Sequence, residues 1–279
     1  MDSSTATPLE LDNAHRILGR VRSISVRHEA LLAGFWNPTK CSFGLEGPAT
    51  SGKHVTSTCT CLLSFLDAGI ILPSFIDSDA RGKLTQWLLT TPWESAKLKK
   101  DNLYTTPIAL ATLLTLDPRQ VNEVRVEEAI KSLVNAALDI DPAGPICFED
   151  HPPSAFLTYW TLRALIAAIS VQTTETTKVP RQRVNLAIQL ATEWIDGELH
   201  RQFSYYSISD LDRFNVLELA YLLAALDLSR REYDTPFDPQ IMARGLDLIF
   251  QAQLSNGLWP RGAPIFLHPS IGHVYPFCI

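Results

Sequence analysis

Two acidic residues stand just before an apolar helical run and are the side chains best suited to act as a general acid. Asp210 and Asp212 flank Leu211, and the run begins at Phe214. A carboxylic acid that stays protonated can give its proton to a substrate. The positive charge of Arg213 should lower the pKa of the adjacent carboxyl group, which opposes this role. The structural alternative is that the acids cap the helix and pair with Arg213.

A second acidic pair, Asp139 and Asp141, resembles part of a metal-binding site. Its spacing to other possible ligands matches no zinc pattern, and the Pro142 that follows is typical of a turn. His268 and His273 lie five residues apart in a loop. We therefore expect no metal and no cofactor. The possible ligands near the pair are Cys147, Glu149, Asp150 and His151.

Hydroxyl groups and aromatic rings gather near the starts of the apolar helical runs. Helix starts and hydroxyl groups favour polar or anionic ligands, so a ligand or peptide pocket is one interpretation. Ordinary helix capping is the other, because Ser and Thr are common at helix starts. If the helix starts converge, the residues at the rim of the resulting cavity would be Thr58, Thr106, Tyr159, Trp160 and Asn215.

Composition and charge narrow the classes of function. The chain has 279 residues, 46% of them hydrophobic, which is enough to bury a large core. Its net charge is −6, and its one basic cluster, at Lys97, Lys99 and Lys100, is typical of a solvated loop. We therefore expect no nucleic-acid partner. The sequence also lacks the phosphate-binding loop, the dinucleotide fingerprint, the hydrolase nucleophile elbow and the zinc-protease helix.

The cysteines and the hydropathy pattern predict the compartment. The five cysteines are odd in number, unevenly spaced and mostly set in apolar runs, which favours reduced core thiols in a cytoplasmic protein. The N-terminus lacks the basic and apolar regions of a signal peptide. Even the apolar run 155–171 is interrupted by Arg163, so we expect no membrane span.

Apolar helices alternate with amphipathic ones along most of the chain. Each apolar run is followed by a run with charges on one face, and the unit repeats about every 50 to 60 residues. A polar arm, residues 1–13, expected to be flexible, and an amphipathic helix at 14–34 precede the repeats. The apolar helices are expected at 56–66, 105–116, 154–171 and 214–228, and their amphipathic partners at 77–89, 121–138, 181–199 and 238–254.

Helices that are apolar on every side need cover on every side. An inner ring of apolar helices inside an outer ring of amphipathic ones, an α/α toroid, supplies that cover. A solenoid of shorter helical repeats is the alternative, although its loops are usually tighter. We expect one toroid domain over residues 1–279. Residues 268–279 resemble the start of a fifth inner helix, which predicts that the chain is an N-terminal fragment of a longer protein.

A motif after the last amphipathic helix supports the toroid. Gln253, Gly257 and Trp259 match the Gln-xxx-Gly-x-Trp motif. The chain therefore resembles the terpenoid cyclases and protein prenyltransferases, whose motif ties adjacent helix ends together. Trp36, Trp93 and Phe203 are expected at comparable loop positions without the Gln and Gly.

The same resemblance gives the acidic pair a possible role. Class II cyclases of this family carry Asp-x-Asp-Asp, whose middle Asp protonates an isoprenoid, so Asp212 would be that acid and Asp210 its neighbour. Arg213 replaces the last Asp of the motif. Prenyltransferases hold zinc with Asp, Cys and His, but no residues here match that spacing.

Three functions remain open. The first is a non-catalytic, regulatory toroid domain of a larger cytoplasmic multidomain protein, which binds a small ligand, a peptide or a neighbouring domain of the same protein. The second is a class II terpene cyclase-like enzyme with Asp212 as proton donor. The third is a peptide-modifying enzyme that uses a metal. The incomplete acidic motifs favour the first.

Overall fold

The structure is a computed structural model of residues 1–279. It describes residues 33, 36–39, 42–43, 55–67, 79–91, 93, 105–138, 155–171, 179–205, 216–233, 238–252, 266–268 and 272–274. These parts contain eight α-helices, one 3-10 helix and two short strand pairs, so the all-α class is confirmed. The chain divides into two compact units, Met1–Arg81 and Gly82–Ile279, and each is described by itself. That they form one domain stays a prediction.

The first unit contains one apolar helix and a short hairpin. Helix α2 (Val55–Asp67) confirms the helix expected at 56–66 and contacts strand β2 (Ser42–Phe43). Strand β1 (Trp36–Asn37) pairs antiparallel with β2, and Trp36 lies opposite Phe43. Trp36 therefore belongs to a strand rather than a loop. Cys59 and Cys61 are buried in α2, where burial raises the pKa of the Cys61 thiol to about 12.

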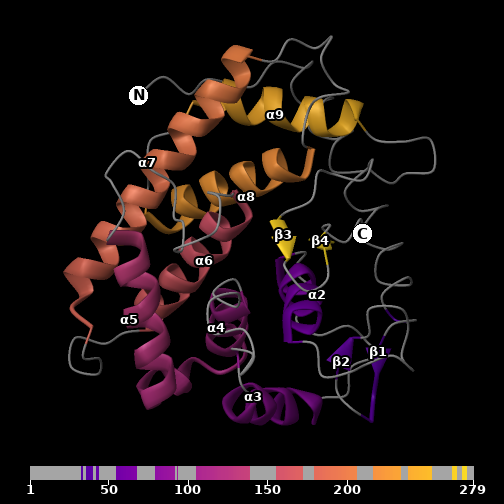
Figure 1. The fold of residues 1–279 in the computed structure, drawn as a ribbon, viewed down its shortest axis with the longest axis vertical. Coiled ribbons are helices and arrows are strands. Elements are labelled where there is room, and N and C mark those ends of the chain that lie inside the picture. Colours follow the sequence, from indigo (N-terminus) through magenta and orange to yellow (C-terminus); the bar gives the residue numbers. More distant parts are fainter. Residues whose placement is uncertain are drawn as a thin grey trace, which may run out of the picture. The chain divides into compact units, whose positions relative to one another are not determined.

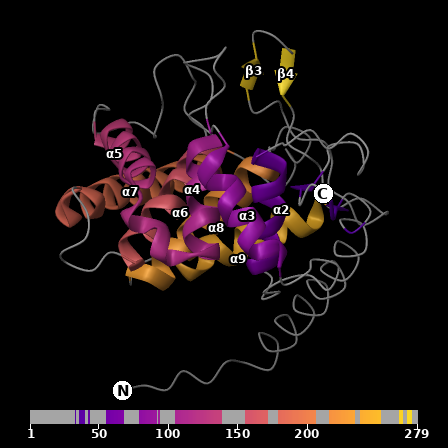
Figure 2. The same cartoon turned by 90° about the horizontal axis from the view of Figure 1, so that it is seen from below.

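Three apolar helices form the centre of the second unit. Helix α6 (Ala155–Val171) contacts both α4 (Thr105–Leu116) and α8 (Val216–Tyr233), and it lies between them (Figures 1 and 2). In α4, every residue except Thr115 is buried. Thr112 and Thr115 donate to carbonyl oxygens four residues earlier, which satisfies hydroxyl groups among apolar neighbours. No helix in the described ranges is long and apolar enough to cross a membrane.

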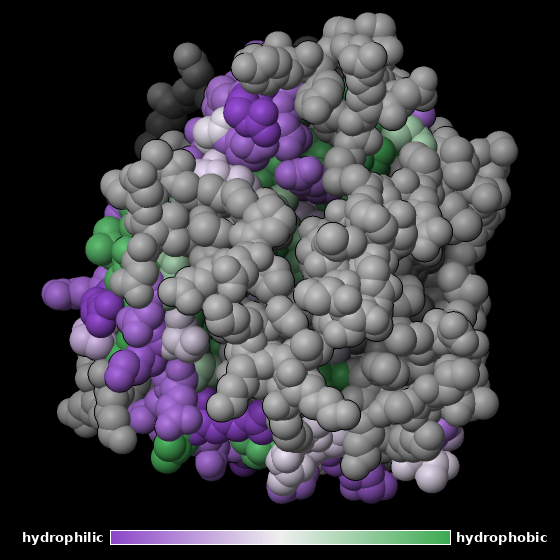
Figure 3. Space-filling view, viewed as in Figure 1, coloured by the Kyte–Doolittle hydropathy of each residue, from purple (hydrophilic) through white to green (hydrophobic). Residues whose placement is uncertain are grey.

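Amphipathic helices cover this centre. Helix α5 (Val124–Leu138) contacts α4 and α6, α7 (Arg181–Tyr205) contacts α5, α6 and α8, and α9 (Pro239–Gln251) contacts α8. In α5, Ile130 and Leu133 are buried, whereas Lys131 is exposed. Hydrophilic side chains predominate over α5 and α7 (Figure 3). The described contacts therefore form a row of apolar helices with amphipathic helices along it.

Polar contacts set the register of α7 against α8. The Tyr233 hydroxyl at the end of α8 donates to Asn185 Oδ1 near the start of α7, at 3.2 Å. The buried hydroxyl oxygens of Thr192 and Ser229 lie 3.1 Å apart. Because residue numbers rise along one helix as they fall along the other, the two helices are antiparallel, as expected for a helical hairpin.

Several helix ends differ from the expected ones. Residues 118–122 form the 3-10 helix η2 (Pro118–Asn122) before α5 begins, because Pro118 cannot continue the hydrogen bonding of α4. Helix α7 continues to Tyr205 instead of ending at 199, which places Phe203 inside a helix rather than in a loop. The last turns of α7 gain an ion pair between Glu198 and Arg201, which holds them helical.

The expected fifth inner helix is wrong over the part that the structure describes. Strand β3 (Phe266–His268) pairs antiparallel with β4 (Gly272–Val274), so residues 272–274 are extended rather than helical. Pro269 follows the first strand, and proline disfavours a helical conformation in the residue before it. Gly272 and the β-branched Val274 are also poor helix formers. The remainder of 268–279 lies outside the described residues.

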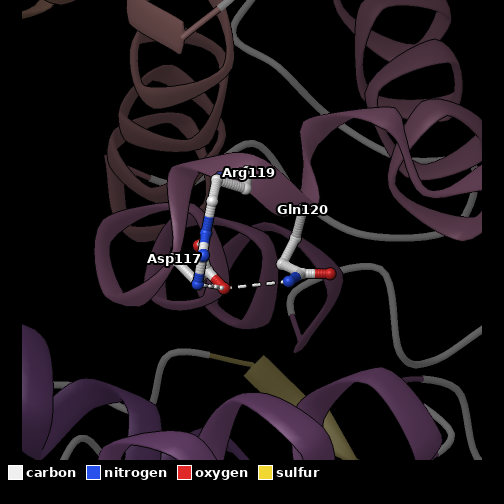
Figure 4. Close-up of polar contacts among 3 residues, drawn as sticks. All are labelled: Asp117, Arg119 and Gln120. Carbon is white, nitrogen blue, oxygen red and sulfur yellow. Dashed lines mark hydrogen bonds and ion pairs between the residues drawn. The ribbon is translucent and has the colours of Figure 1, made fainter.

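Asp117 separates α4 from η2 and holds the turn between them. Its carboxylate accepts hydrogen bonds from Arg119 Nε at 2.8 Å, Arg119 Nη2 at 3.0 Å and Gln120 Nε2 at 2.9 Å (Figure 4). It also accepts one from the Arg119 backbone N–H, as an N-cap does. These bonds, led by those from Arg119 and Gln120, lower the pKa of Asp117 to about 2.

We expect Asp117→Ala to lower the free energy of unfolding by about 1 kcal/mol at pH 7, the usual cost of a lost N-cap. Asp117→Asn keeps an acceptor and should lose less. Because the folded pKa lies below the ordinary value of 3.8, the ionised carboxylate stabilises the fold above pH 4, and this stabilisation is lost as the pH falls toward 2. Urea unfolding at pH 7, 5 and 3 measures the gap between wild type and Asp117→Asn. A gap of constant size at all three values would contradict the assigned role.

Candidate functional site

Two of the residues expected at a cavity rim, Tyr159 and Trp160, lie in a cluster of four aromatic rings. Phe156, Tyr159 and Trp160 follow a three- and four-residue spacing in the first two turns of α6, so they share one face of that helix. Tyr221 of α8 faces them. Its ring centroid lies 5.1 Å from that of Phe156, 5.4 Å from that of Tyr159 and 6.4 Å from that of Trp160. We call these four residues the aromatic cluster.

Arg163 brings a positive charge to the aromatic cluster. It follows Tyr159 by one helical turn, and its Nη1 donates a hydrogen bond of 2.7 Å to the Tyr159 hydroxyl. The guanidinium carbon lies 5.5 Å from the centroid of the Trp160 ring and 6.0 Å from that of Tyr159. These distances are those of cation–π contacts. The faces of two rings of the cluster are therefore already near a cation.

The aromatic cluster contains one buried hydrogen-bond donor, the indole N–H of Trp160, without a described acceptor. Trp160 is only 3% exposed, and its indole Nε1 has no hydrogen-bond partner among the residues that the structure describes. Burial raises the pKa of the Tyr221 hydroxyl well above its usual range; Tyr159 adds to the rise and the nearby Trp160 side chain opposes it. Trp160 thus lies close to the Tyr221 hydroxyl without the geometry of a hydrogen bond. Tyr221 stays protonated, so both groups are neutral donors.

No family model matches the sequence, and no curated protein or solved structure is significantly similar to the chain. The resemblance to the toroid family therefore depends on the sequence motif alone. Gln253, Gly257 and Trp259, which form that motif, lie outside the described residues.

The other expected site residues are not part of the aromatic cluster. Thr58 is fully buried in α2, which belongs to the first unit, and Thr106 is buried in the first turn of α4. The structure describes no group of three or more His, Cys, Asp or Glu residues that could hold a metal ion. The residues of the two acidic sites and the last rim residue lie outside the described ranges: Asp139, Asp141, Cys147, Glu149, Asp150, His151, Asp210, Asp212 and Asn215.

Sequence reasoning missed two members of the site. Arg163 entered only as a charge that interrupts an apolar run, and Tyr221 only as one residue of an expected helix. A charged residue one turn after an aromatic pair was a signal for Arg163, because residues four apart meet on a helix. No local signal pointed to Tyr221, since its contacts depend on how α8 packs against α6.

A pair of glutamates between α7 and α8 was also missed. Glu198 accepts hydrogen bonds from Arg201 and from Gln202 Nε2, the latter at 3.1 Å. Glu218 of α8 has a raised pKa, chiefly because of burial and then because of the charge of Glu198, while Arg201 lowers it. Glu218 is therefore more easily protonated than an ordinary glutamate.

One tryptophan that was expected at a loop position, Trp93, contacts the end of a helix. Trp93 lies just after α3 (Ala80–Thr90), and its indole N–H donates to the Leu88 carbonyl at 2.8 Å. Arg125 of α5 covers the Trp93 ring at 4.2 Å and donates to the Leu89 carbonyl at 2.8 Å. An aromatic ring and a stacked arginine thus satisfy the last carbonyls of α3, where arginine also suits the helix dipole.

A second arginine lies over an aromatic residue at the end of another amphipathic helix. Arg244 of α9 lies 5.0 Å from the centroid of the Phe203 ring at the end of α7. Phe203 is buried at 9% exposure, so this contact joins α9 to the core side of α7. Trp93 and Phe203 therefore both hold neighbouring helices together through arginine.

Proposed function

We propose that the chain is a non-catalytic, ligand-binding domain of a larger cytoplasmic multidomain protein, built as an α/α toroid. The observation that carries the proposal is the buried indole N–H of Trp160, which has no acceptor among the described residues. A buried donor without a partner is costly, and such groups often mark functional sites. A small ligand, a peptide or a neighbouring domain that brings an acceptor to the aromatic cluster would remove this cost.

The charge at the aromatic cluster favours binding over cyclase chemistry. A cyclase stabilises carbocations with aromatic faces, but here the Arg163 guanidinium already lies 5.5 Å from the Trp160 ring centroid. A second cation at the same rings would be repelled by the first. In addition, the positive charge of Arg213, the residue after Asp212, is expected to lower the pKa of the Asp212 carboxyl group. A lowered pKa disfavours a general acid, which must stay protonated until it gives up its proton.

The order of helix contacts fits the proposed toroid and also fits its alternative, an open solenoid. Helix α6 lies between α4 and α8, while α5 and α7 run along the outside of the row. A toroid and an open solenoid share this local order and differ in whether the row closes. An experimental structure decides between them: a closed ring is expected, and an open superhelix would refute the toroid.

The alternative is a class II terpene cyclase-like enzyme with Asp212 as proton donor. Its support is the aromatic cluster at the start of α8, since Asp212 precedes that helix by only a few residues. The test is incubation of the full chain with squalene or geranylgeranyl diphosphate, followed by product analysis. Our proposal expects no cyclic product from either substrate. Products that form with wild type and disappear in Asp212→Asn would establish the alternative.

Binding is tested with small phenyl compounds that differ in charge. The full chain is titrated with acetophenone, benzoate, benzylammonium and ethylbenzene, and saturation-transfer NMR measures the affinity for each. We expect at least one compound to bind, and Phe156→Ala to weaken that binding because it removes one ring of the cluster. The control is Trp194→Phe, which alters a partly exposed ring of α7. Equal affinities in wild type and Phe156→Ala, or no binding of any compound, would rule out the aromatic cluster as the site.

A further inference from the structure

Glu218 lies on the side of α8 that faces α7. The buried hydroxyl oxygens of Thr192 and Ser229, 3.1 Å apart, show which sides of the two helices meet. Glu218 precedes Ser229 by eleven residues, about three helical turns, so both lie on the same side of α8. Because the helices are antiparallel, counting back along α8 and forward along α7 from the two contacts places residues 200–203 at the level of Glu218.

The end of α7 at this level carries a carboxylate that is paired with an arginine. Arg201 Nε donates to Glu198 Oε2 at 2.8 Å, Arg201 Nη2 donates to Oε1, and Gln202 Nε2 donates to Oε1 at 3.1 Å. The Glu198 side chain is only 10% exposed, whereas that of Arg201 is 59% exposed. His200 is exposed and pairs with Asp196 of its own helix. The charged groups of α7 nearest to Glu218 are therefore Glu198 and Arg201.

Glu198 and Glu218 place two carboxylates beside one guanidinium. Burial and then the negative charge of Glu198 raise the pKa of Glu218, while the positive charge of Arg201 lowers it. Glu218 also lies in the first turn of α8, where a helix favours a negative charge. Since the pKa is raised nevertheless, Arg201 and the helix start offset the burial and the repulsion only in part.

The other helices that contact α8 carry few charged groups. Helix α6 has one charged residue, Arg163, which donates to the hydroxyl of Tyr159, and α9 has Arg244 and Asp247. None of these groups is among those whose charge shifts the pKa of Glu218. Among the described residues, the charges that control Glu218 are therefore those at the end of α7.

We propose that Glu198, Arg201 and Glu218 form a pH-sensitive latch, which holds the end of α7 more tightly against α8 when Glu218 takes up a proton. Protonation removes the repulsion between the carboxylates and the cost of burying a second negative charge. The stability that Glu218 contributes is full below its ordinary pKa of 4.5 and is lost as the pH rises through its higher folded pKa. This inference does not depend on the proposed binding function.

The experiment compares hydrogen exchange of the α7 amides in wild type and Glu218→Gln, on the full chain, at pH 4, 5.5 and 7. Glutamine resembles a protonated glutamate, so the variant should slow exchange over residues 198–205 at pH 7. The expected change is about twofold to fivefold, the size usual for a partly exposed charge pair, and it should disappear at pH 4. Comparison of the two proteins at one pH cancels the intrinsic pH dependence of exchange.

Two further variants separate the latch from other effects. Glu193→Gln removes an exposed carboxylate elsewhere on α7 and should leave exchange over 198–205 unchanged at each pH. In a Glu198→Gln background, Glu218→Gln should slow exchange less at pH 7, because the repulsion is already gone. Equal exchange of wild type and Glu218→Gln at pH 7, or the same difference at all three pH values, would overturn the inference. An equal effect of Glu218→Gln in both backgrounds would also overturn it, since burial alone would then explain the effect.

Discussion

Trp93→Ala is expected to lower the free energy of unfolding by about 3–5 kcal/mol, the usual range for the loss of a buried tryptophan. Trp93 is 5% exposed, so its removal would leave a large cavity. The change also deletes the hydrogen bond to the Leu88 carbonyl and the ring on which Arg125 stacks. Both interactions hold the end of α3 against α5. Urea unfolding followed by circular dichroism measures the loss.

A pair of milder variants isolates the hydrogen bond from the packing. Trp93→Phe keeps a ring beneath Arg125 but removes the indole N–H, so the Leu88 carbonyl keeps the 3.2 Å hydrogen bond from Arg125 Nη1 and loses the shorter one from Trp93. We expect this lost bond to lower the free energy of unfolding by about 1 kcal/mol. Trp87 of α3 provides the matched control, since its buried Nε1 has no hydrogen-bond partner in the described part of the chain. Trp87→Phe removes no such bond. Equal losses in the two variants would show that the Trp93 bond contributes little.

Gly245→Val should be the second most damaging change, with a loss of about 1–3 kcal/mol from overpacking. A Cβ atom at Gly245 of α9 would lie 2.6 Å from Leu223 Cδ1 and 3.2 Å from Leu223 Cγ in α8. Leu223 is only 3% exposed, so its side chain has little space into which it can move. The absence of a side chain at Gly245 therefore sets how closely α8 and α9 approach.

Gly197 of α7 is the matched control because a Cβ atom there would meet nothing within 4 Å. Gly197→Ala should stabilise the protein by about 0.5–1 kcal/mol, since alanine is the better helix former. At Gly245 the same gain should be cancelled by the clash with Leu223. Thermal and urea unfolding of the two alanine variants test this contrast. Similar stabilisation by Gly245→Ala and Gly197→Ala would mean that α8 and α9 can separate without cost.

Most helices were predictable because their signals are local. The bounds of α4 follow from Thr105, Thr106 and Pro107 at its start and from Asp117-Pro118 after its end, and the structure confirms them. The apolar character of α6 likewise predicted a buried helix. The ends of α7 and the nature of residues 118–122 were less predictable, because ion pairs and a proline shift helix ends by a turn without changing the hydrophobic pattern.

The candidate site was predictable only in part. Tyr159 and Trp160 were expected near a helix start that could bind a ligand, and both lie in the aromatic cluster. Thr106 is buried in α4 without a described role in binding. Tyr221 and Arg163 were not expected, although the Tyr221 ring lies 5.1 Å from that of Phe156 and the Arg163 guanidinium lies 5.5 Å from the Trp160 ring centroid. Arg163 contacts residues one turn away on its own helix, so the spacing along the chain could have indicated it. Tyr221 contacts rings of another helix, and the spacing along the chain does not indicate such contacts.

The amino-acid sequence by itself determined that this chain forms alternating apolar and amphipathic helices, because propensity, capping and hydrophobic periodicity act between residues a few positions apart. Only the tertiary structure decided that Arg125 covers Trp93, that Leu223 lies against Gly245 and that Tyr221 meets Trp160. These contacts join different helices, and each depends on the rotation and separation at which the helices pack. Side-chain volume and burial across the whole unit set those quantities, so no local pattern encodes them.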